Sequence, residues 1–168
     1  MHNIKYIFPK NKHKIVAGLD NIDISFPYIF IFEGFYDSVF VKNGICVGTK
    51  AVTDYQLKLI SDRYPKHQIV VAFDNDRPGI ESMIKMMKSD KNFRYFRWFN
   101  KNTKSKDINE LIVEKNNVNI FSDPKVLEKM IVDKLSMKMY LMQNDLWINK
   151  NYNKNIDVKN GCTSSFWA

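Results

Sequence analysis

Residues 69–80 read IVVAFDNDRPGI. Five apolar residues run directly into Asp74 and Asp76, and Pro78 and Gly79 follow at once. A short continuous apolar run is typical of a strand that is covered on both faces of a sheet. Two carboxylates this close repel each other unless a positive charge lies nearby. The stretch therefore predicts a buried strand that ends in a site for a cation.

Strand and helix patterns alternate on both sides of this stretch. The elements predicted before it are a strand at 28–33, a short helix at 35–42, a strand at 45–47 and a helix at 53–62 that begins with a Thr-x-x-Gln capping box. The elements predicted after it are a helix at 78–89, a strand at 93–99 and a helix at 107–117. Strands that alternate with helices at this spacing pair in parallel. We therefore expect an α/β fold with a compact sheet of about four parallel strands flanked by helices.

The C-terminal part has a different pattern. Asp123 and Pro124 begin a predicted long helix that ends near Met142. Its apolar stripe is formed by Leu127, Ile131, Leu135, Met139 and Met142. A Met-rich face of this kind either packs on its own sheet or docks a partner protein. The expected organisation is a basic N-terminal segment (1–25), an α/β domain (26–118), a C-terminal helical extension (119–149) and a flexible tail (150–168).

The composition is that of about one globular domain. The chain has 168 residues, 45% apolar content and a formal net charge of +8. This positive excess favours a polyanionic partner, nucleic acid above all. No apolar run approaches the roughly 20 residues that a membrane span needs, and the first residues lack the pattern of a signal peptide. Cys46 and Cys162 are far apart and match no zinc spacing, so we expect a reduced, cytoplasmic protein.

Acidic side chains follow several of the predicted strands at the same end. Glu33 follows the first strand, Asp74 and Asp76 follow the third, and Asp107 follows the fourth. In an open parallel sheet, binding residues gather beyond the carboxyl ends of the strands. Carboxylate oxygens are the ligands that Mg²⁺ and Mn²⁺ prefer. The sequence therefore predicts a divalent-metal site at this edge of the sheet.

Each of these acids also has a purely structural interpretation. Asp76 is placed to cap the helix that starts near Pro78, and Asp107-x-x-Glu110 has the spacing of a capping box. A salt bridge to Lys50 would account for Glu33. The sequence alone leaves these alternatives open.

Four short motifs carry a resemblance to a known family. Residues 33–37, EGFYD, resemble the E-G-x-x-D motif of the Toprim domain, and residues 74–79, DNDRPG, resemble its D-x-D-x-x-G motif. Gly48-Thr49 falls where primase-type Toprim domains have a Gly-Thr turn. Residues 106–111, KDINEL, are similar to the K-D-x-N-E-L segment of bacterial and phage primases. The motifs occur in the family's order, and the resemblance covers about residues 26–118.

The resemblance implies the catalytic module of a DNA primase, which would use Mg²⁺ or Mn²⁺ for the nucleotidyl transfer of RNA primer synthesis. Carried over by position, Glu33 matches the general acid/base and Asp37 matches a supporting acid. The implied catalytic residues are Glu33, Asp37, Lys106 and Asp107, and the implied metal ligands are Glu33, Asp74 and Asp76. Lys106 would face phosphate.

Basic residues around the predicted site are candidates for contact with nucleic acid. They are Lys50, Arg77, Lys101 and Lys104. Residues 93–106, FRYFRWFNKNTKSK, also interleave aromatic side chains with cations, which suits stacking on bases and contact with phosphates. Strand alternation instead favours the sheet core for these aromatics, with Phe93, Tyr95 and Phe99 on one face and Phe96 and Trp98 on the other.

The chain departs from whole bacterial primases, because two distant cysteines cannot form their zinc module. It is therefore expected to be a fragment, one subunit of a split primase or a minimal Toprim protein, in the cytoplasm of a bacterium or a phage-infected host. The expected partners are single-stranded DNA template and ribonucleotides, with a helicase or a zinc-binding primase subunit as further candidates. Two alternatives stay open: a Toprim nuclease that hydrolyses phosphodiesters, and a non-catalytic subunit that binds nucleic acid or protein.

Overall fold

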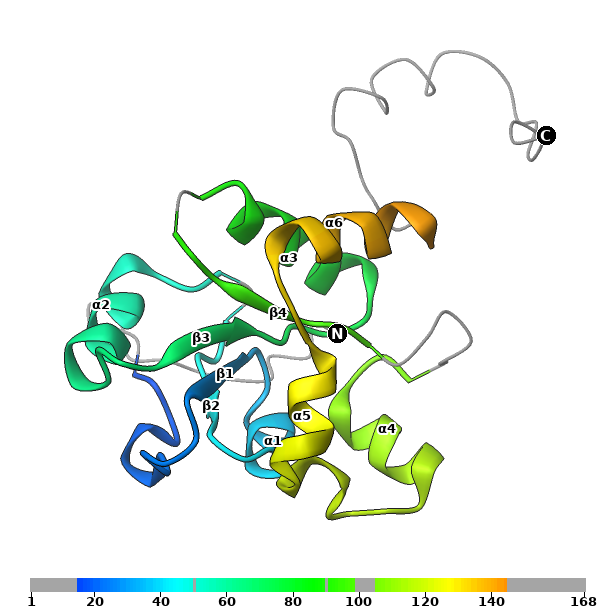
Figure 1. Ribbon diagram of the computed structural model, residues 1–168, viewed down its shortest axis with the longest axis horizontal. Helices are drawn as coiled ribbons and strands as arrows, with labels where there is room; N and C mark the ends of the chain where they lie inside the picture. The colour runs from blue at the N-terminus through cyan, green and yellow to red at the C-terminus, as the bar shows by residue number, and fades with distance from the viewer. Residues whose placement is uncertain (1–14, 50, 90, 99–104, 145–168) are drawn as a thin grey trace, which may run out of the picture.

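One five-stranded sheet forms the centre of the molecule, in a computed structural model that describes residues 15–49, 51–89, 91–98 and 105–144 (Figure 1). The strands are β1 (Tyr28–Phe32), β2 (Gly44–Cys46), β3 (Gln68–Val71), β4 (Arg94–Phe96) and β5 (Ile131–Val132). Their order across the sheet is β2-β1-β3-β4-β5. The first four strands are parallel, and β5 runs antiparallel to β4. The predicted α/β fold is confirmed, with a fifth strand added at one edge.

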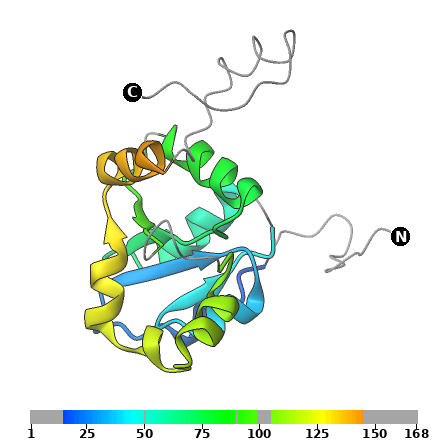
Figure 2. The same ribbon diagram turned by 90° about the vertical axis from the view of Figure 1, so that its right-hand side faces the viewer.

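Helices cover both faces of this sheet. They are α1 (Phe35–Val39), α2 (Asp54–Arg63), α3 (Arg77–Met87), α4 (Ile108–Lys115), α5 (Pro124–Met130) and α6 (Lys134–Gln143), with 3₁₀ turns at Leu19–Asn21 and Ile120–Ser122. Helices α2, α3 and α6 lie on one face, and α1, α4 and α5 lie on the other (Figure 1, Figure 2). None of the described helices is both long enough and apolar enough to cross a bilayer.

Two apolar clusters, one on each face of the sheet, make up the core. Alternate residues of β1 divide between them: Ile29 and Ile31 belong to the α2/α3/α6 side, and Phe30 and Phe32 belong to the α4/α5 side. Because successive side chains of a strand point to opposite faces, a strand covered on both sides has an unbroken apolar sequence. This explains why the run that precedes Asp74 contains no polar residue.

The aromatic side chains around β4 follow the same rule. Phe93 and Tyr95 lie in one cluster, and Phe96 and Trp98 lie in the other, all less than 10% exposed. The prediction that these aromatics form sheet core is confirmed for these four. Phe99 lies outside the described residues.

The predicted capping box at the start of α2 is also confirmed. The Thr53 hydroxyl accepts a hydrogen bond from the Gln56 backbone amide at 3.2 Å, and the Gln56 side-chain oxygen accepts one from the Thr53 amide at 3.1 Å. Gln56 is fully buried, and its side-chain nitrogen donates to the backbone oxygens of Ile15 and Val47. The cap therefore also attaches α2 to the chain beside β2.

The prediction of one long helix over 124–142 is wrong in its middle. Ile131 and Val132 form β5, and the amide of Arg97, the residue after β4, donates to the Met130 oxygen at 2.7 Å. The Asp133 side chain then caps α6 by accepting from the Ser136 amide at 2.8 Å. Two β-branched residues followed by a capping aspartate favour a strand and a fresh helix start, and here this local preference prevails.

The break also changes which face of the second helix is buried. Met137 and Leu141 are buried, whereas Leu135, Met139 and Met142 are 68%, 53% and 55% exposed. The stripe predicted from Leu127 through Met142 is therefore not continuous. Leu127 and Met130 of α5 pack with Phe121 in the same cluster as α4. Residues 145–149 of the expected extension, the expected tail (150–168) and residues 1–14 lie outside the described part of the chain.

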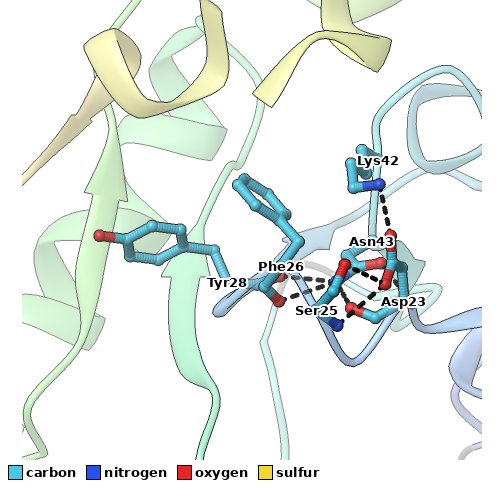
Figure 3. Close-up of polar contacts among 6 residues, drawn as sticks. All are labelled: Asp23, Ser25, Phe26, Tyr28, Lys42 and Asn43. Atoms are coloured by element: carbon cyan, nitrogen blue, oxygen red, sulfur yellow. Dashed lines mark hydrogen bonds and ion pairs between the residues drawn. The ribbon is translucent and has the colours of Figure 1, made fainter. Parts of the chain in front are cut away.

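Asn43, directly before β2, is hydrogen-bonded to the segment that leads into β1 (Figure 3). It has a left-handed backbone (φ 55°) and is 7% exposed. Its side-chain nitrogen donates to the backbone oxygens of Asp23, Phe26 and Tyr28 at 3.0, 3.3 and 3.1 Å, and its side-chain oxygen accepts from the Asp23 amide. The Lys42 ammonium, 2.6 Å from the Asp23 carboxylate, holds the pKa of that carboxyl well below its usual range. One amide group thus satisfies several backbone groups that enter the sheet.

We predict that Asn43→Ala lowers the free energy of unfolding by about 3 kcal/mol, because it leaves buried carbonyls unpaired and puts alanine in a left-handed conformation. Asn43→Gly tolerates that conformation and loses only the hydrogen bonds, so its loss is about 2 kcal/mol. Urea unfolding followed by circular dichroism measures both. The matched control is Asn116→Ala, since Asn116 is exposed and also left-handed (φ 49°). It should cost only about 1 kcal/mol, and an equal cost at both asparagines would contradict the role given to the buried amide.

Candidate functional site

The site lies where the chain changes direction across the sheet. β1 and β3 are neighbours, with Ile31 opposite Val71, yet their following helices α1 and α3 lie on opposite faces. In a doubly wound sheet this point leaves a crevice beyond the carboxyl ends of the two strands. Glu33 directly follows β1 and Asp74 comes shortly after β3, and both residues line this crevice. The parallel pairing of two strands therefore brings together acids 41 positions apart (74 − 33).

A cavity of about 420 Å³ occupies this crevice. Its lining residues are Glu33, Gly34, Tyr36, Asp37, Gly48, Thr49, Asp74, Asp76, Asp107 and Asn109. All four motifs noted in the sequence contribute to it. The structure thus brings together five of the predicted acids.

Hydrogen bonds to the start of α3 and to Lys106 hold the D-x-D loop in place. The Asp76 carboxylate accepts from the Gly79 amide at 2.8 Å and so caps α3. The Asn75 amide donates to the Lys106 oxygen at 2.6 Å. A side chain at position 79 would meet the Asp74 carbonyl oxygen at 2.2 Å, so only glycine fits there. Asp76 therefore caps a helix and lines the cavity at once, and the structural interpretation does not compete with the functional one.

Asp37 connects the first motif to the last. It is 7% exposed, and its Oδ1 accepts from the backbone amides of Ile108 and Asn109 and from the Asn109 side chain, at 3.1, 3.3 and 2.9 Å. Burial, and then the negative charge of Asp107, raise the pKa of the Asp37 carboxyl. Gly34 leaves room for this carboxylate, since a Cβ there would lie 2.6 Å from Asp37 Oδ2. Asp37 is thus a positioning residue that fixes the start of α4 beside the start of α1.

Asp74 is surrounded by the other acids of the cavity. Partial burial, and then the negative charges of Glu33, Asp37, Asp76 and Asp107, raise the pKa of Asp74 to about 7. Each of those charges disfavours the ionised form of its neighbours. A cation in the cavity would relieve this repulsion.

Among the other predicted residues, the structure describes Asp107, Lys106 and Arg77. Asp107 lines the cavity but also caps α4, since its Oδ1 accepts from the Glu110 amide at 2.8 Å. The Glu110 carboxylate accepts from the Lys106 amide, so only half of the expected capping box forms. Lys106 is paired with Glu110 at 3.2 Å, and Arg77 is paired with Glu81 at 3.3 Å. Lys50, Lys101 and Lys104 lie outside the described residues, and so does the proposed salt bridge between Glu33 and Lys50.

Two lining residues were missed when the sequence was considered alone. Asn109 lies inside the K-D-x-N-E-L segment, where its place in the motif was the available signal. The apolar residues at 35, 36, 39 and 40 are the basis of the short helix predicted at 35–42, and Tyr36 would lie on its apolar side. Instead Phe35, Tyr36 and Val39 are 44%, 67% and 55% exposed. The apolar spacing of α1 therefore did not indicate which of its residues face the core.

Residues 30–112 match the family model described as Toprim-like. No curated protein matches the chain. Toprim domains are found in enzymes that act on nucleic acids, and the match indicates a metal-dependent role of that general kind. It does not separate primases from nucleases.

Toprim domains generally bind Mg²⁺, and the donors of this cavity fit that ion chemically. Carboxylates are hard oxygen ligands, and burial followed by the negative charges of the neighbouring acids raises the pKa of Asp74. Within the described part of the chain, no three His, Cys, Asp or Glu side chains form a complete metal-binding group by themselves. Mg²⁺ does not require one, because it usually keeps several waters and takes only one or two protein carboxylates.

We predict that Asp74→Asn stabilises the protein in metal-free buffer at pH 8, by about 1–2 kcal/mol after allowance for solvent screening. The folded-state pKa of Asp74, about 7, lies above its ordinary value of 3.8, so the folded protein holds that proton more tightly. Wild-type stability therefore falls as the pH rises from about 4 to about 7, and the advantage of the variant grows over the same window. Urea unfolding at several pH values measures it.

Adding Mg²⁺ should reverse this ranking. The ion would stabilise the wild type, in proportion to its binding, and would stabilise Asp74→Asn much less. The control is Asp62→Asn, which removes the same charge from the surface of α2, where Asp62 pairs with Lys58. That variant should differ from wild type by under about 0.5 kcal/mol and keep the full Mg²⁺ response. A destabilised Asp74→Asn protein in the absence of metal would contradict the repulsion described above.

Proposed function

We propose that this chain is the catalytic module of a DNA primase, which joins ribonucleotides into RNA primers on a single-stranded DNA template with Mg²⁺ or Mn²⁺. The observation that supports it most is the buried hydrogen bonding between Asp37 and residues 108–109. This hydrogen bonding fixes the primase-like K-D-x-N-E-L segment beside α1, and the Asn75 amide, which donates to the Lys106 oxygen, joins the same segment to the D-x-D loop. The Gly48-Thr49 turn, the second primase-like feature, lines the same cavity.

In this proposal Asp74 and Asp76, with Glu33, hold the divalent metal. When bound, that metal supplies a lowered pKa for an attacking hydroxyl and neutralises charge on the reacting phosphate. Asp37 keeps the cavity in shape, since its carboxylate is already engaged by three donors. Asp107 adds negative charge to the wall, and its cap to α4 fixes its place there.

Glu33 is the residue proposed to move a proton. It lines the cavity at the end of β1 and is half-buried. The 3′-hydroxyl oxygen of the primer would bond to the α-phosphorus of a ribonucleoside triphosphate, the bond to the leaving oxygen would break, and pyrophosphate would depart. Glu33 would take the hydroxyl proton as general base.

Cations around the cavity are proposed to orient phosphates. Lys106 pairs with Glu110 at the start of α4, Arg77 pairs with Glu81 within α3, and both basic side chains are more than half exposed. Lys50, Lys101 and Lys104 belong to the same proposal on sequence grounds alone. A helicase or a separate zinc-binding subunit is the partner proposed for start-site selection and processivity.

The deciding experiment incubates the full chain with single-stranded template, labelled ribonucleotides and Mn²⁺, and separates the products by size. Labelled chains longer than one nucleotide would support primer synthesis. Shortened template would show a nuclease instead. Neither product, together with an Asp76→Asn variant whose Mn²⁺ affinity equals that of the wild type, would leave a non-catalytic binding subunit.

We predict that Glu33→Gln lowers turnover by at least about 100-fold, because glutamine cannot take a proton. The stabilisation of the folded protein by Mg²⁺ should be largely kept, since a side-chain oxygen remains at the same place. Primer yield and the Mg²⁺-dependent melting temperature measure the two effects separately. The matched control, Glu128→Gln on the exposed surface of α5, should change neither. An equal loss of turnover and metal response would contradict the role as a base.

A further inference from the structure

An exposed pair of aromatic side chains stands at the edge of the cavity. Phe35 and Tyr36 are the first two residues of α1, and their rings meet edge to face with centroids 5.9 Å apart at 72°. They are 44% and 67% exposed. Tyr36 lines the cavity together with Glu33, Asp74 and Asp76. A large aromatic surface therefore stands beside the carboxylates without packing into the core.

The backbone that carries Tyr36 is firmly placed. The next residue, Asp37, is buried and is held by three hydrogen bonds to the start of α4. On its other side, Gly34 lies against the Asp37 carboxylate. Phe35 supports the ring from its edge. Because the backbone of Tyr36 is already fixed, stacking of a planar ligand on its ring costs little further conformational entropy.

The chemistry of the cavity favours a partner that carries both a phosphate and a ring. A wall of carboxylates repels phosphate unless a metal ion intervenes. Stacking on an aromatic face does not depend on charge, and every base has a π-face. An aromatic side chain beside acids is thus suited to the base of a nucleotide whose phosphate lies at the acids.

We propose that Tyr36, supported by Phe35, is the stacking subsite for a nucleobase of the nucleic acid or nucleotide bound at this cavity. The proposal rests on the proposed function to the extent that it takes a nucleotide as the ligand. It adds the residue that would hold the base, and it requires neither polymerisation nor hydrolysis. Val39, 55% exposed on the same helix, does not line the cavity and is assigned no part in it.

The test measures equilibrium binding of a fluorescent thymidine oligonucleotide to the full chain in Mg²⁺, by anisotropy and without ribonucleotides. A second oligonucleotide of the same length and charge is abasic. Tyr36→Ala should weaken binding of the base-bearing strand by about 5- to 100-fold and leave the abasic strand unaffected. Tyr36→Trp and Tyr36→Phe should bind about as well as the wild type, since both keep the ring.

The dependence of binding on salt provides a second readout. Removing a stacked ring releases no counterions, so Tyr36→Ala should lower affinity equally at all salt concentrations and leave the slope of log affinity against log salt unchanged. Replacing a phosphate-contacting lysine would instead reduce that slope by about one unit. Two matched controls are Tyr55→Ala, an exposed tyrosine on α2, and Val39→Ser. Both should bind the two strands as the wild type does.

Repeating the titration with a ribonucleoside triphosphate identifies which nucleotide provides the base. If Tyr36→Ala weakens binding of only the triphosphate or only the DNA strand, the result supports the subsite and shows which of the two ligands places its base there. Unchanged binding of all base-bearing ligands by Tyr36→Ala overturns the proposal and leaves the aromatic pair as a surface for protein. An equal loss in Val39→Ser, or on the abasic strand, overturns it as well.

These outcomes are separable from those of the proposed function. Base-dependent binding that needs Tyr36, without primer synthesis or cleavage, supports the subsite and contradicts the primase. Primer synthesis by a Tyr36→Ala protein with unchanged affinities supports the primase and overturns the subsite. A wild-type chain that binds none of the three ligands overturns both. The length of the strand recovered after each titration shows whether cleavage occurred.

Discussion

The buried carboxylate of Asp37 is the contact on which the arrangement of the site depends. It joins α1 to the start of α4 across 71 positions of sequence by accepting from two backbone amides and one side-chain amide. Backbone amides at the start of a helix have no partner within it, and here an acid from another element supplies one. The contact consequently sets the distance between the segment after β1 and the segment before α4. Together with the hydrogen bond from the Asn75 amide to the Lys106 oxygen, it fixes the wall of the cavity that residues 107–109 form.

The same arrangement places like charges together at a cost to the fold. Five acids line one cavity, and burial together with these like charges raises the pKa of Asp74 to about 7. A site for structure alone would relieve that repulsion by exchanging an acid for an amide, a change that requires no repacking. Clustered perturbed carboxylates in a cleft are therefore better explained by a ligand than by stability. Asp76 and Asp107 show how part of the cost is recovered, since each also caps a helix.

The sequence predicted the strands and the convergence of acids well, for a physical reason. Strands buried on both faces need unbroken apolar runs, and the end of such a run marks the edge of the sheet. The prediction of one C-terminal helix was wrong, because it relied on the helical spacing of apolar residues from Leu127 to Met142. The β-branched pair Ile131-Val132 interrupts that helix by pairing with β4, and this tertiary contact is not visible in local spacing. Tyr36 was misjudged for a related reason: apolar spacing on a five-residue helix cannot say which side faces the sheet. The chemical roles of the lining acids stay predictions.

Charge explains why the proposed stacking and the proposed metal binding would suit the same site. The chain carries a formal charge of +8, yet the cations described next to the cavity are already paired: Lys106 with Glu110, and Arg77 with Glu81. A phosphate that approaches therefore meets carboxylates before it meets unpaired positive charge among these neighbours. A divalent ion offsets the repulsion at the phosphate but makes no contact with the base of the nucleotide. A neutral ring such as that of Tyr36 would bind the base by stacking without adding charge to the cavity, so the acids would remain available to the metal.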